Sequence, residues 1–272
     1  MSGNPLAAAE PWDLVADGYA EFGPAIMAPF SARALELAGL SAQSQVVDVA
    51  AGPGTLSLPA AERVAQVSAI DFSEPMIQRL AEDASTAGLT NIETLVGDGQ
   101  ALPFDDDSFD AGFSMFGLMF FPDRAKGFAE LFRVLRPGAT AVVSSWAPVA
   151  ESTLMRMMFG AFAAADPTIS EPQPNFLDLE NPEVFATEMR TAGFAGVSIQ
   201  RHTSTIGFAD SDEMWETMVR SSAPLLLMRR TVGEQVWAER VALMCAYLAV
   251  NYRPNKPLST TAFLGIGHKP AP

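Results

Sequence analysis

Acidic residues at the ends of three predicted strands are the groups in this sequence best suited to hold a polar ligand. Asp48 ends an apolar run and leads into small residues at 50–54 (AAGPG), which let backbone N–H groups at a helix start approach a carboxylate or phosphate. Asp71 follows about 20 residues later, where an acidic side chain can accept hydrogen bonds from both hydroxyls of a ribose. Asp98 follows a third strand and can accept a hydrogen bond from an exocyclic amine such as adenine N6.

Each of these residues also has a purely structural interpretation. Asp71 can cap the helix that follows it, as Ser73 also can, and the pair Asp98-Gly99 can be a simple turn. A glycine-rich segment between a strand and a helix is also found in dinucleotide-binding proteins. The combination is more specific than its parts, because the ends of parallel strands lie along one edge of a sheet, where open α/β sheets bind ligands.

Few side chains of this sequence are suited to accept a proton. His202 and His268, the only two histidines, each lie in or beside a late predicted strand, where a structural role and a general-base role are both open. Cys245 is the only cysteine, which excludes an internal disulfide and a cysteine-rich metal cluster. We interpret the acidic run 105–107 as a solvated turn, and no metal site is expected.

The elements that must position these residues alternate regularly. From Gln45 to Ala147, short runs rich in β-branched residues alternate with longer amphipathic stretches. Such alternation predicts an α/β fold with a parallel sheet and helices on both faces.

We interpret the whole chain, residues 1–272, as one domain with additions to a central core. Helices punctuated by Gly23-Pro24 and Pro29 are expected near the N-terminus. The predicted parts are an N-terminal helical cover (1–40), a ligand-binding core (41–148), and two helical lid insertions (149–182 and 210–255). A helix over 182–192 and strands near 197–202 and 262–269 complete the expected core.

The composition of the chain restricts the classes of molecule that it is expected to bind. Asp and Glu outnumber Lys and Arg by 32 to 17, and the net charge of -15 repels nucleic acid and anionic lipid surfaces. The N-terminus lacks the pattern of a secretory signal, and the longest apolar stretch, near 111–121, is too short to span a bilayer. We therefore expect a cytoplasmic protein that binds neither nucleic acid nor membrane.

Four segments, in this order, resemble the motifs of the class I S-adenosylmethionine-dependent methyltransferases, particularly the small-molecule enzymes of the ubiquinone/menaquinone-biosynthesis type. They are VVDVAAGPG (46–54), AIDFSEPM (69–76), GDGQALPFDDDSFDAGFSMFGLMFF (97–121) and LFRVLRPGATAVVSSW (131–146). The resemblance covers roughly residues 45–147. It implies a Rossmann-like, mostly parallel seven-stranded sheet. Ala50 departs from the family pattern, because it stands where the first glycine of the motif is usual.

The resemblance also implies S-adenosyl-L-methionine as cofactor, S-adenosyl-L-homocysteine as product, and a set of cofactor contacts. The 52–54 loop would face the methionine end, and Asp71 would hold the ribose. Phe72 and Met76 would flank the adenine ring, and Asp98 would form a hydrogen bond with the edge of that ring. The full implied set is Tyr19, Asp48, Ala50, Gly52, Gly54, Asp71, Phe72, Met76, Asp98, Gly99, Gln100, Ser114 and Phe116. Tyr19 is also a third candidate base.

The substrate contacts are expected from the stretch after the fourth strand and from the apolar insertions. The predicted pocket residues are Met115, Phe116, Leu118, Met119, Met158, Phe162 and Met218. Large apolar side chains favour methyl transfer to O, C or N of a small, mostly hydrophobic metabolite. A homodimer remains open.

Two other functions remain open. The same fold can bind the cofactor without transferring its methyl group. A nicotinamide-dependent oxidoreductase is the other alternative, because residues 52–57 (GPGTLS) are one residue away from a dinucleotide fingerprint.

Overall fold

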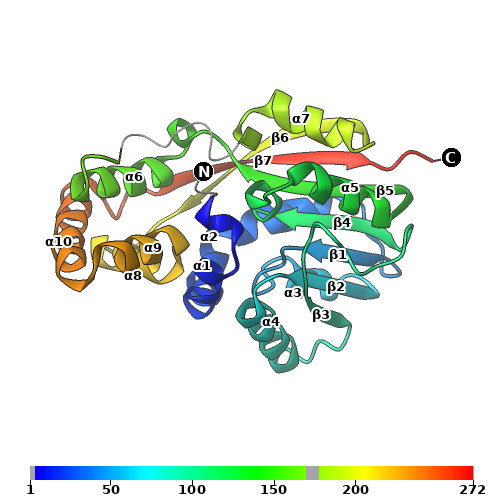
Figure 1. The fold of residues 1–272 in the computed structure, drawn as a ribbon, viewed down its shortest axis with the longest axis horizontal. Helices are drawn as coiled ribbons and strands as arrows, with labels where there is room; N and C mark the ends of the chain where they lie inside the picture. The colour runs from blue at the N-terminus through cyan, green and yellow to red at the C-terminus, as the bar shows by residue number, and fades with distance from the viewer. Residues whose placement is uncertain (1–3, 170–177, 272) are drawn as a thin grey trace.

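The computed structural model describes residues 4–169 and 178–271, and within them seven strands form one sheet (Figure 1). The strand order is β3-β2-β1-β4-β5-β7-β6. Strands β1 to β5 pair in parallel, whereas β7 is antiparallel to both β5 and β6. The predicted α/β class with a mostly parallel seven-stranded sheet is confirmed.

The strands are β1 (Gln45–Val49), β2 (Gln66–Asp71), β3 (Ile92–Val96), β4 (Phe109–Met115), β5 (Leu135–Trp146), β6 (Ala195–Ile206) and β7 (Leu258–His268). The α-helices are α1 (Glu10–Asp13), α2 (Ala16–Leu37), α3 (Ser57–Ala61), α4 (Glu74–Thr86), α5 (Arg124–Val134), α6 (Thr153–Ala165), α7 (Pro182–Thr191), α8 (Ser211–Ser221), α9 (Ala223–Val232) and α10 (Glu234–Asn251). Short 3₁₀ turns include η1 (Pro5–Ala7) and η2 (Leu118–Phe120).

Both faces of the sheet are apolar, because successive side chains of a strand point to opposite sides. Val142 of β5 belongs to a buried cluster with residues of α2 and α3. Its neighbours Ala141 and Val143 belong to another cluster, which includes residues of α5 and α7. Each face is therefore covered by helices, as continuous apolar strands require.

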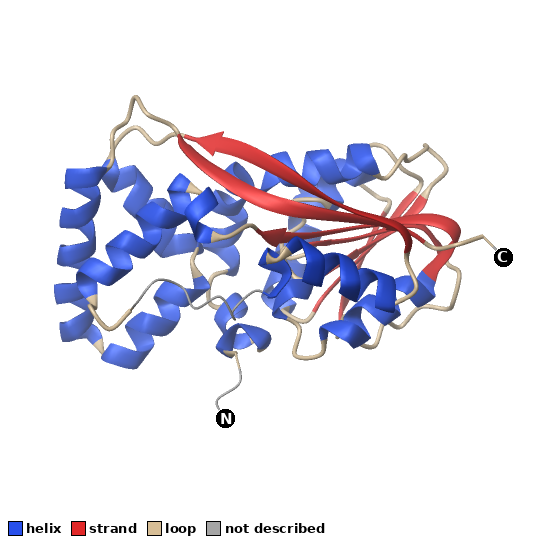
Figure 2. Ribbon diagram, turned by 90° about the horizontal axis from the view of Figure 1, so that it is seen from above, coloured by secondary structure: helices blue, strands red, loops and turns tan. Residues whose placement is uncertain are grey.

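Helices α6, α8, α9 and α10 form a separate helical unit at one end of the molecule (Figure 1). The long β6–β7 ribbon, paired from Ala195↔His268 to Ile206↔Leu258, reaches toward this unit (Figure 2). The unit has its own apolar cluster, with Leu154, Met214 and Leu248 fully buried. Residues 170–177 of the segment predicted as the first insertion lie outside the described residues.

Helix α2 differs from the expectation of interrupted helices near the N-terminus. Pro24 and Pro29 lie inside one continuous helix over Ala16–Leu37. A proline in a helix removes a backbone hydrogen bond and costs about 3 kcal/mol or more. Burial of Phe30, Ala34 and other residues of this helix against the sheet supplies compensating stabilisation.

None of the helices described by the structure combines the length and the apolar character that a membrane crossing requires.

Candidate functional site

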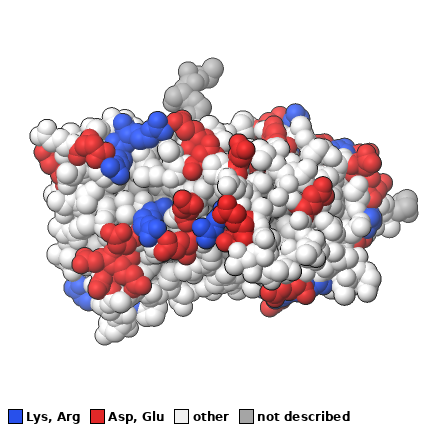
Figure 3. Space-filling model, turned by 90° about the horizontal axis from the view of Figure 1, so that it is seen from below, with Lys and Arg blue, Asp and Glu red and all other residues white. Residues whose placement is uncertain are grey.

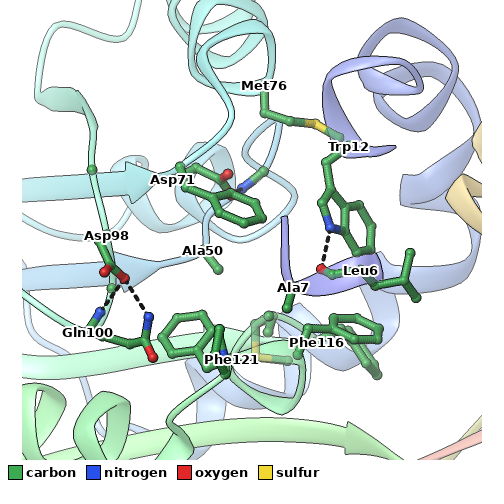
Figure 4. A pocket seen from close by; sticks show the side chains of 18 of the residues that line it. Leu6, Ala7, Trp12, Ala50, Asp71, Met76, Asp98, Gln100, Phe116 and Phe121 are labelled. Atoms are coloured by element: carbon green, nitrogen blue, oxygen red, sulfur yellow. Dashed lines mark hydrogen bonds between the residues drawn. The ribbon is translucent and has the colours of Figure 1, made fainter. Parts of the chain in front are cut away.

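A pocket lies over the carboxyl ends of β1, β2, β3 and β4, at the loops that follow these parallel strands (Figure 4). Part of this pocket is open to solvent. Predicted cofactor or substrate contacts that line it are Tyr19, Ala50, Gly52, Asp71, Phe72, Met76, Asp98, Gly99, Gln100, Met115 and Phe116. Four strand-end segments distant in sequence therefore meet in one pocket.

Asp71, the last residue of β2, is held rigidly at the pocket wall. Its carboxylate accepts hydrogen bonds from the backbone N–H groups of Gly52 (2.8 Å) and Ser73 (2.9 Å). Burial raises the pKa of this carboxyl to about 6, while the backbone N–H groups act in the opposite direction. Each of its oxygens accepts one of these bonds and has capacity for another, so Asp71 can accept from two donors of a ligand.

Asp48 near the end of β1 lies behind the loop rather than on the pocket wall. One carboxylate oxygen accepts a hydrogen bond from the Ser57 hydroxyl (2.7 Å), and the other has no partner among the described residues. Burial raises the pKa of Asp48 to about 7, the Ser57 hydrogen bond lowers it, and the negative charge of Asp71 raises it further. A buried, unsatisfied carboxylate oxygen favours a nearby ligand that donates a hydrogen bond or carries positive charge.

The raised pKa of Asp48 predicts a pH-dependent stability. The folded protein binds a proton that the unfolded chain, with a carboxyl pKa near 3.8, releases, so the free energy of unfolding falls as pH rises toward about 7. Urea denaturation without ligand gives the free energy of unfolding of Asp48→Asn minus that of the parent. This difference should increase by about 2–3 kcal/mol from pH 5 to pH 8 in favour of the variant. The exposed control Asp105→Asn should show no such gain, and an equal difference at both pH values would contradict the assignment.

The 50–54 loop reaches the pocket through left-handed backbone. Ala50 (φ 59°), Gly52 (φ 54°) and Gly54 (φ 92°) all have positive φ. A side chain at Gly54 would come within 2.2 Å of Leu80, so this glycine serves packing against α4 and does not line the pocket. Ala50 and Gly52 lie on the pocket wall itself.

The segment after β3 forms the opposite side of the pocket. The Asp98 carboxylate accepts hydrogen bonds from the backbone N–H (2.8 Å) and side-chain amide (3.0 Å) of Gln100. Gly99 has no room for a side chain, because a Cβ would lie 2.5 Å from the Phe121 ring and 2.7 Å from Val49. Glycine at this position therefore lets the segment after β3 pack closely against Phe121 and Val49.

Phe116, just after β4, is a strained residue that its surroundings hold in place. Its φ of 59° is unfavourable for a bulky side chain. Its backbone N–H donates to the buried Ser144 hydroxyl (2.9 Å), and its ring stacks on Trp146 with centroids 4.1 Å apart. Strain of this kind is frequent at functional sites, and here it directs an aromatic ring to the pocket.

Tyr19 of α2 lies on the pocket wall and edge-on to Trp12 of α1. Burial, and then the charge of Asp71, raise the pKa of the Tyr19 hydroxyl to about 12. At neutral pH this group stays protonated, so it is suited to donate a hydrogen bond.

The remaining predicted contacts lie elsewhere. Ser114 is fully buried and its hydroxyl accepts from the backbone N–H of Leu118, so it shapes the turn after β4. Leu118 and Met119 are buried in the cluster beneath the pocket. Met158, Phe162 and Met218 pack in the apolar cluster of the helical unit. These five predicted substrate contacts are absent from this pocket wall because their side chains are used to build cores.

The two histidines occupy different ends of the sheet. His202 lies edge-on to the Phe30 ring (centroids 5.4 Å), and Phe30 contacts Phe116, so one aromatic ring separates His202 from the pocket wall. His268 pairs with Thr140 early in β5 and interacts with its hydroxyl (3.1 Å). Because β7 is antiparallel, His268 lies at the opposite edge and does not face the pocket.

Some wall residues carried no recognisable signal in the sequence. Leu6 and Ala7 of η1 lie across the pocket, and Leu6 accepts a hydrogen bond from the Trp12 indole (2.9 Å; Figure 4). Both residues lie within the predicted N-terminal cover (1–40), but no motif in the sequence marks these two as wall residues. Gly97 and Pro122 complete the wall, whereas Phe120 and Phe121 fall in the apolar stretch after β4 that the sequence singles out.

The pocket wall contains two acidic residues, Asp71 and Asp98, and no Lys, Arg or His among the described residues that line it. The arginines of α8 and α9 are engaged in ion pairs, as with Arg220–Glu21 (2.6 Å) and Arg230–Glu10 (2.6 Å). On the face drawn in Figure 3, basic side chains likewise lie as separate spots beside acidic ones. The electrostatics favour a neutral or cationic ligand.

Comparison with known proteins agrees with this geometry. The family model for a methyltransferase domain matches residues 46–138. An uncharacterized protein of Mycobacterium tuberculosis is 36% identical over 183 residues, which are 67% of this chain and 65% of the relative. The match thus spans slightly less than two thirds of that relative's length.

A second relative and a solved structure extend the comparison. The demethylmenaquinone methyltransferase of Clavibacter sepedonicus is 34% identical over 179 residues, 61% of this chain and 71% of that protein. The crystal structure of the [4+2]-cyclase SpnF superimposes over 100% of both chains with a TM-score of 0.63 and 19% identity. At that identity the similarity shows a common fold.

Proposed function

The chain belongs to the class I S-adenosylmethionine-dependent methyltransferases, and on this premise we propose that it methylates O, C or N of a small, neutral, largely apolar molecule. One observation carries the proposal: the pocket wall combines carboxylates with apolar and aromatic side chains, and no Lys, Arg or His is present among the described residues that line it. Demethylmenaquinone-type relatives support an acceptor of this hydrophobic class.

The residues present fit S-adenosylmethionine as the cofactor. Asp71 would accept hydrogen bonds from the ribose hydroxyls, and Asp98 with Gln100 would contact the adenine edge. Phe72 and Met76 would flank the adenine ring. The unpartnered Asp48 oxygen lies behind the loop that would face the methionine end, and its negative charge suits the cofactor's ammonium group.

When bound, the cofactor supplies a methyl group already activated by a sulfonium. The chain then has to align the acceptor and exclude water. Met115, Phe116 and Trp12 line the pocket and are placed to do so. Tyr19 would donate a hydrogen bond rather than take a proton, since its pKa is about 12. His202 lies closer to the pocket than His268, so it is the histidine better placed to act as a base.

The proposal also assigns a lid role to the helical unit and a cellular location to the protein. Helices α6 and α8 to α10 would restrict access to the acceptor end, because α8 and α9 contact the N-terminal cover through ion pairs. We also infer action in the cytoplasm and no binding of nucleic acid, and the net charge of -15 supports the second of these inferences. A homodimer is compatible with these features.

A binding and turnover experiment tests the proposal. In calorimetric titration the protein should bind S-adenosylmethionine at micromolar concentration and NAD not at all. Incubation with neutral phenols, quinols and amines should then form S-adenosylhomocysteine, whereas carboxylated analogues of the same acceptors should react poorly. Preference for NAD would overturn the cofactor assignment. Cofactor binding without turnover of any acceptor would favour the alternative in which this fold binds the cofactor without transferring methyl.

A further inference from the structure

The residue pair Ala50 and Gly117 connects the loops after β1 and β4 inside the pocket. Ala50 has a φ of 59°, a conformation that glycine adopts freely and alanine only at an energetic cost. In Figure 4 its methyl group points toward the side of the pocket formed by Phe116 and Phe121. An unfavourable alanine retained on a ligand-facing wall indicates that its methyl group has a use.

Gly117 is complementary to that methyl group. Its φ of -101° is accessible to any residue, so the backbone does not require glycine here. A Cβ at Gly117 would lie 2.2 Å from the Ala50 Cβ, far inside van der Waals contact. The space between the loops therefore holds one methyl group, and Ala50 supplies it.

Neither loop is free to move away. On the β1 side, the Ala51 N–H donates to Ile70 (3.1 Å) and the Gly52 N–H to Asp71 (2.8 Å). On the β4 side, Phe116 is held by Ser144 and by stacking on Trp146. A change in the size of the Ala50 side chain must therefore alter the pocket wall instead of being absorbed elsewhere.

We propose that Ala50 is a positioning residue: its methyl group fixes the separation of the β1 and β4 loops and thereby the part of the pocket wall beside Phe116. The inference rests on the proposed function, because the group held at that wall would be the methionine end of the cofactor. Glycine at position 50 would satisfy the backbone better and would leave the wall less defined.

Three variants test the pair: Ala50→Gly, Gly117→Ala and the double variant. Ala50→Gly should raise the midpoint of thermal unfolding of the ligand-free protein, or leave it unchanged, and weaken S-adenosylhomocysteine binding about tenfold. Gly117→Ala should lower both stability and affinity. The double variant should recover at least tenfold in affinity over Gly117→Ala, because one methyl group again fills the space. The control Ala238→Gly, on the exposed side of α10, should lower stability without changing affinity.

Weaker binding without a loss of stability in Ala50→Gly is not expected of a purely structural residue. Unchanged affinity in Ala50→Gly, or a double variant no better than Gly117→Ala, would overturn the proposal. If the parent protein binds neither S-adenosylmethionine nor S-adenosylhomocysteine, the proposed function fails by itself. Non-additive stability changes of the two substitutions would still establish the packing of the pair in the ligand-free protein.

Discussion

Replacing Asp71 by asparagine is expected to weaken S-adenosylmethionine binding by about 100-fold or more. The carboxylate is buried and accepts from the N–H groups of Gly52 and Ser73 with its two oxygens. An amide has one oxygen and one NH₂ group, so its NH₂ group would face one of these N–H donors. The variant would also lack the negatively charged oxygens that accept from the ribose. Together these changes should reduce the binding free energy by about 3 kcal/mol. Calorimetric titration of parent and variant measures the effect.

The matched control is Asp105→Asn, the same change of acid to amide at an exposed position away from the pocket. It should bind the cofactor like the parent. Thermal unfolding should show that Asp71→Asn is folded, and Asp71→Glu, which keeps the charge on a longer side chain, should retain more affinity than the amide. Parent-like affinity in Asp71→Asn would remove Asp71 from the cofactor site.

Replacing Phe30 by alanine is expected to destabilise the protein strongly. Phe30 is fully buried, and its ring packs edge-on against Phe116 (5.4 Å), Trp146 (5.9 Å) and His202 (5.4 Å). Removing a buried aromatic ring costs about 3–5 kcal/mol through lost transfer energy and the remaining cavity. That loss is a large fraction of the stability of a typical protein, about 5–15 kcal/mol.

Urea denaturation checks this value, with Leu243→Ala as the control. Leu243 is 50% exposed on α10, so its truncation should change the free energy of unfolding by about 0.5 kcal/mol or less. Phe30→Leu should fall between the two. Equal stability of Phe30→Ala and Leu243→Ala would contradict the role of this aromatic cluster as part of the core.

Part of the pocket could be predicted from local patterns in the sequence. Local patterns predicted that Asp48, Asp71 and Asp98 lie at or near the ends of successive strands and that 50–54 is a tight loop, because strand periodicity and turn chemistry are local properties. Parallel pairing then placed those ends at one edge, as expected from the α/β alternation. The side chains of Asp71 and Asp98 accordingly lie on one pocket wall.

The identity of the apolar side chains that face the pocket depends on how distant helices and strands pack together. Helical periodicity shows that Met158, Phe162 and Met218 lie on apolar faces, but it does not identify the surface against which they pack. In the structure they pack together in the apolar cluster of the helical unit. The antiparallel direction of β7, which places His268 at the far edge, depends on pairing between distant strands. The space shared by Ala50 and Gly117 likewise exists only after β1 and β4 have paired, because it lies between two loops that have no local relation in the chain.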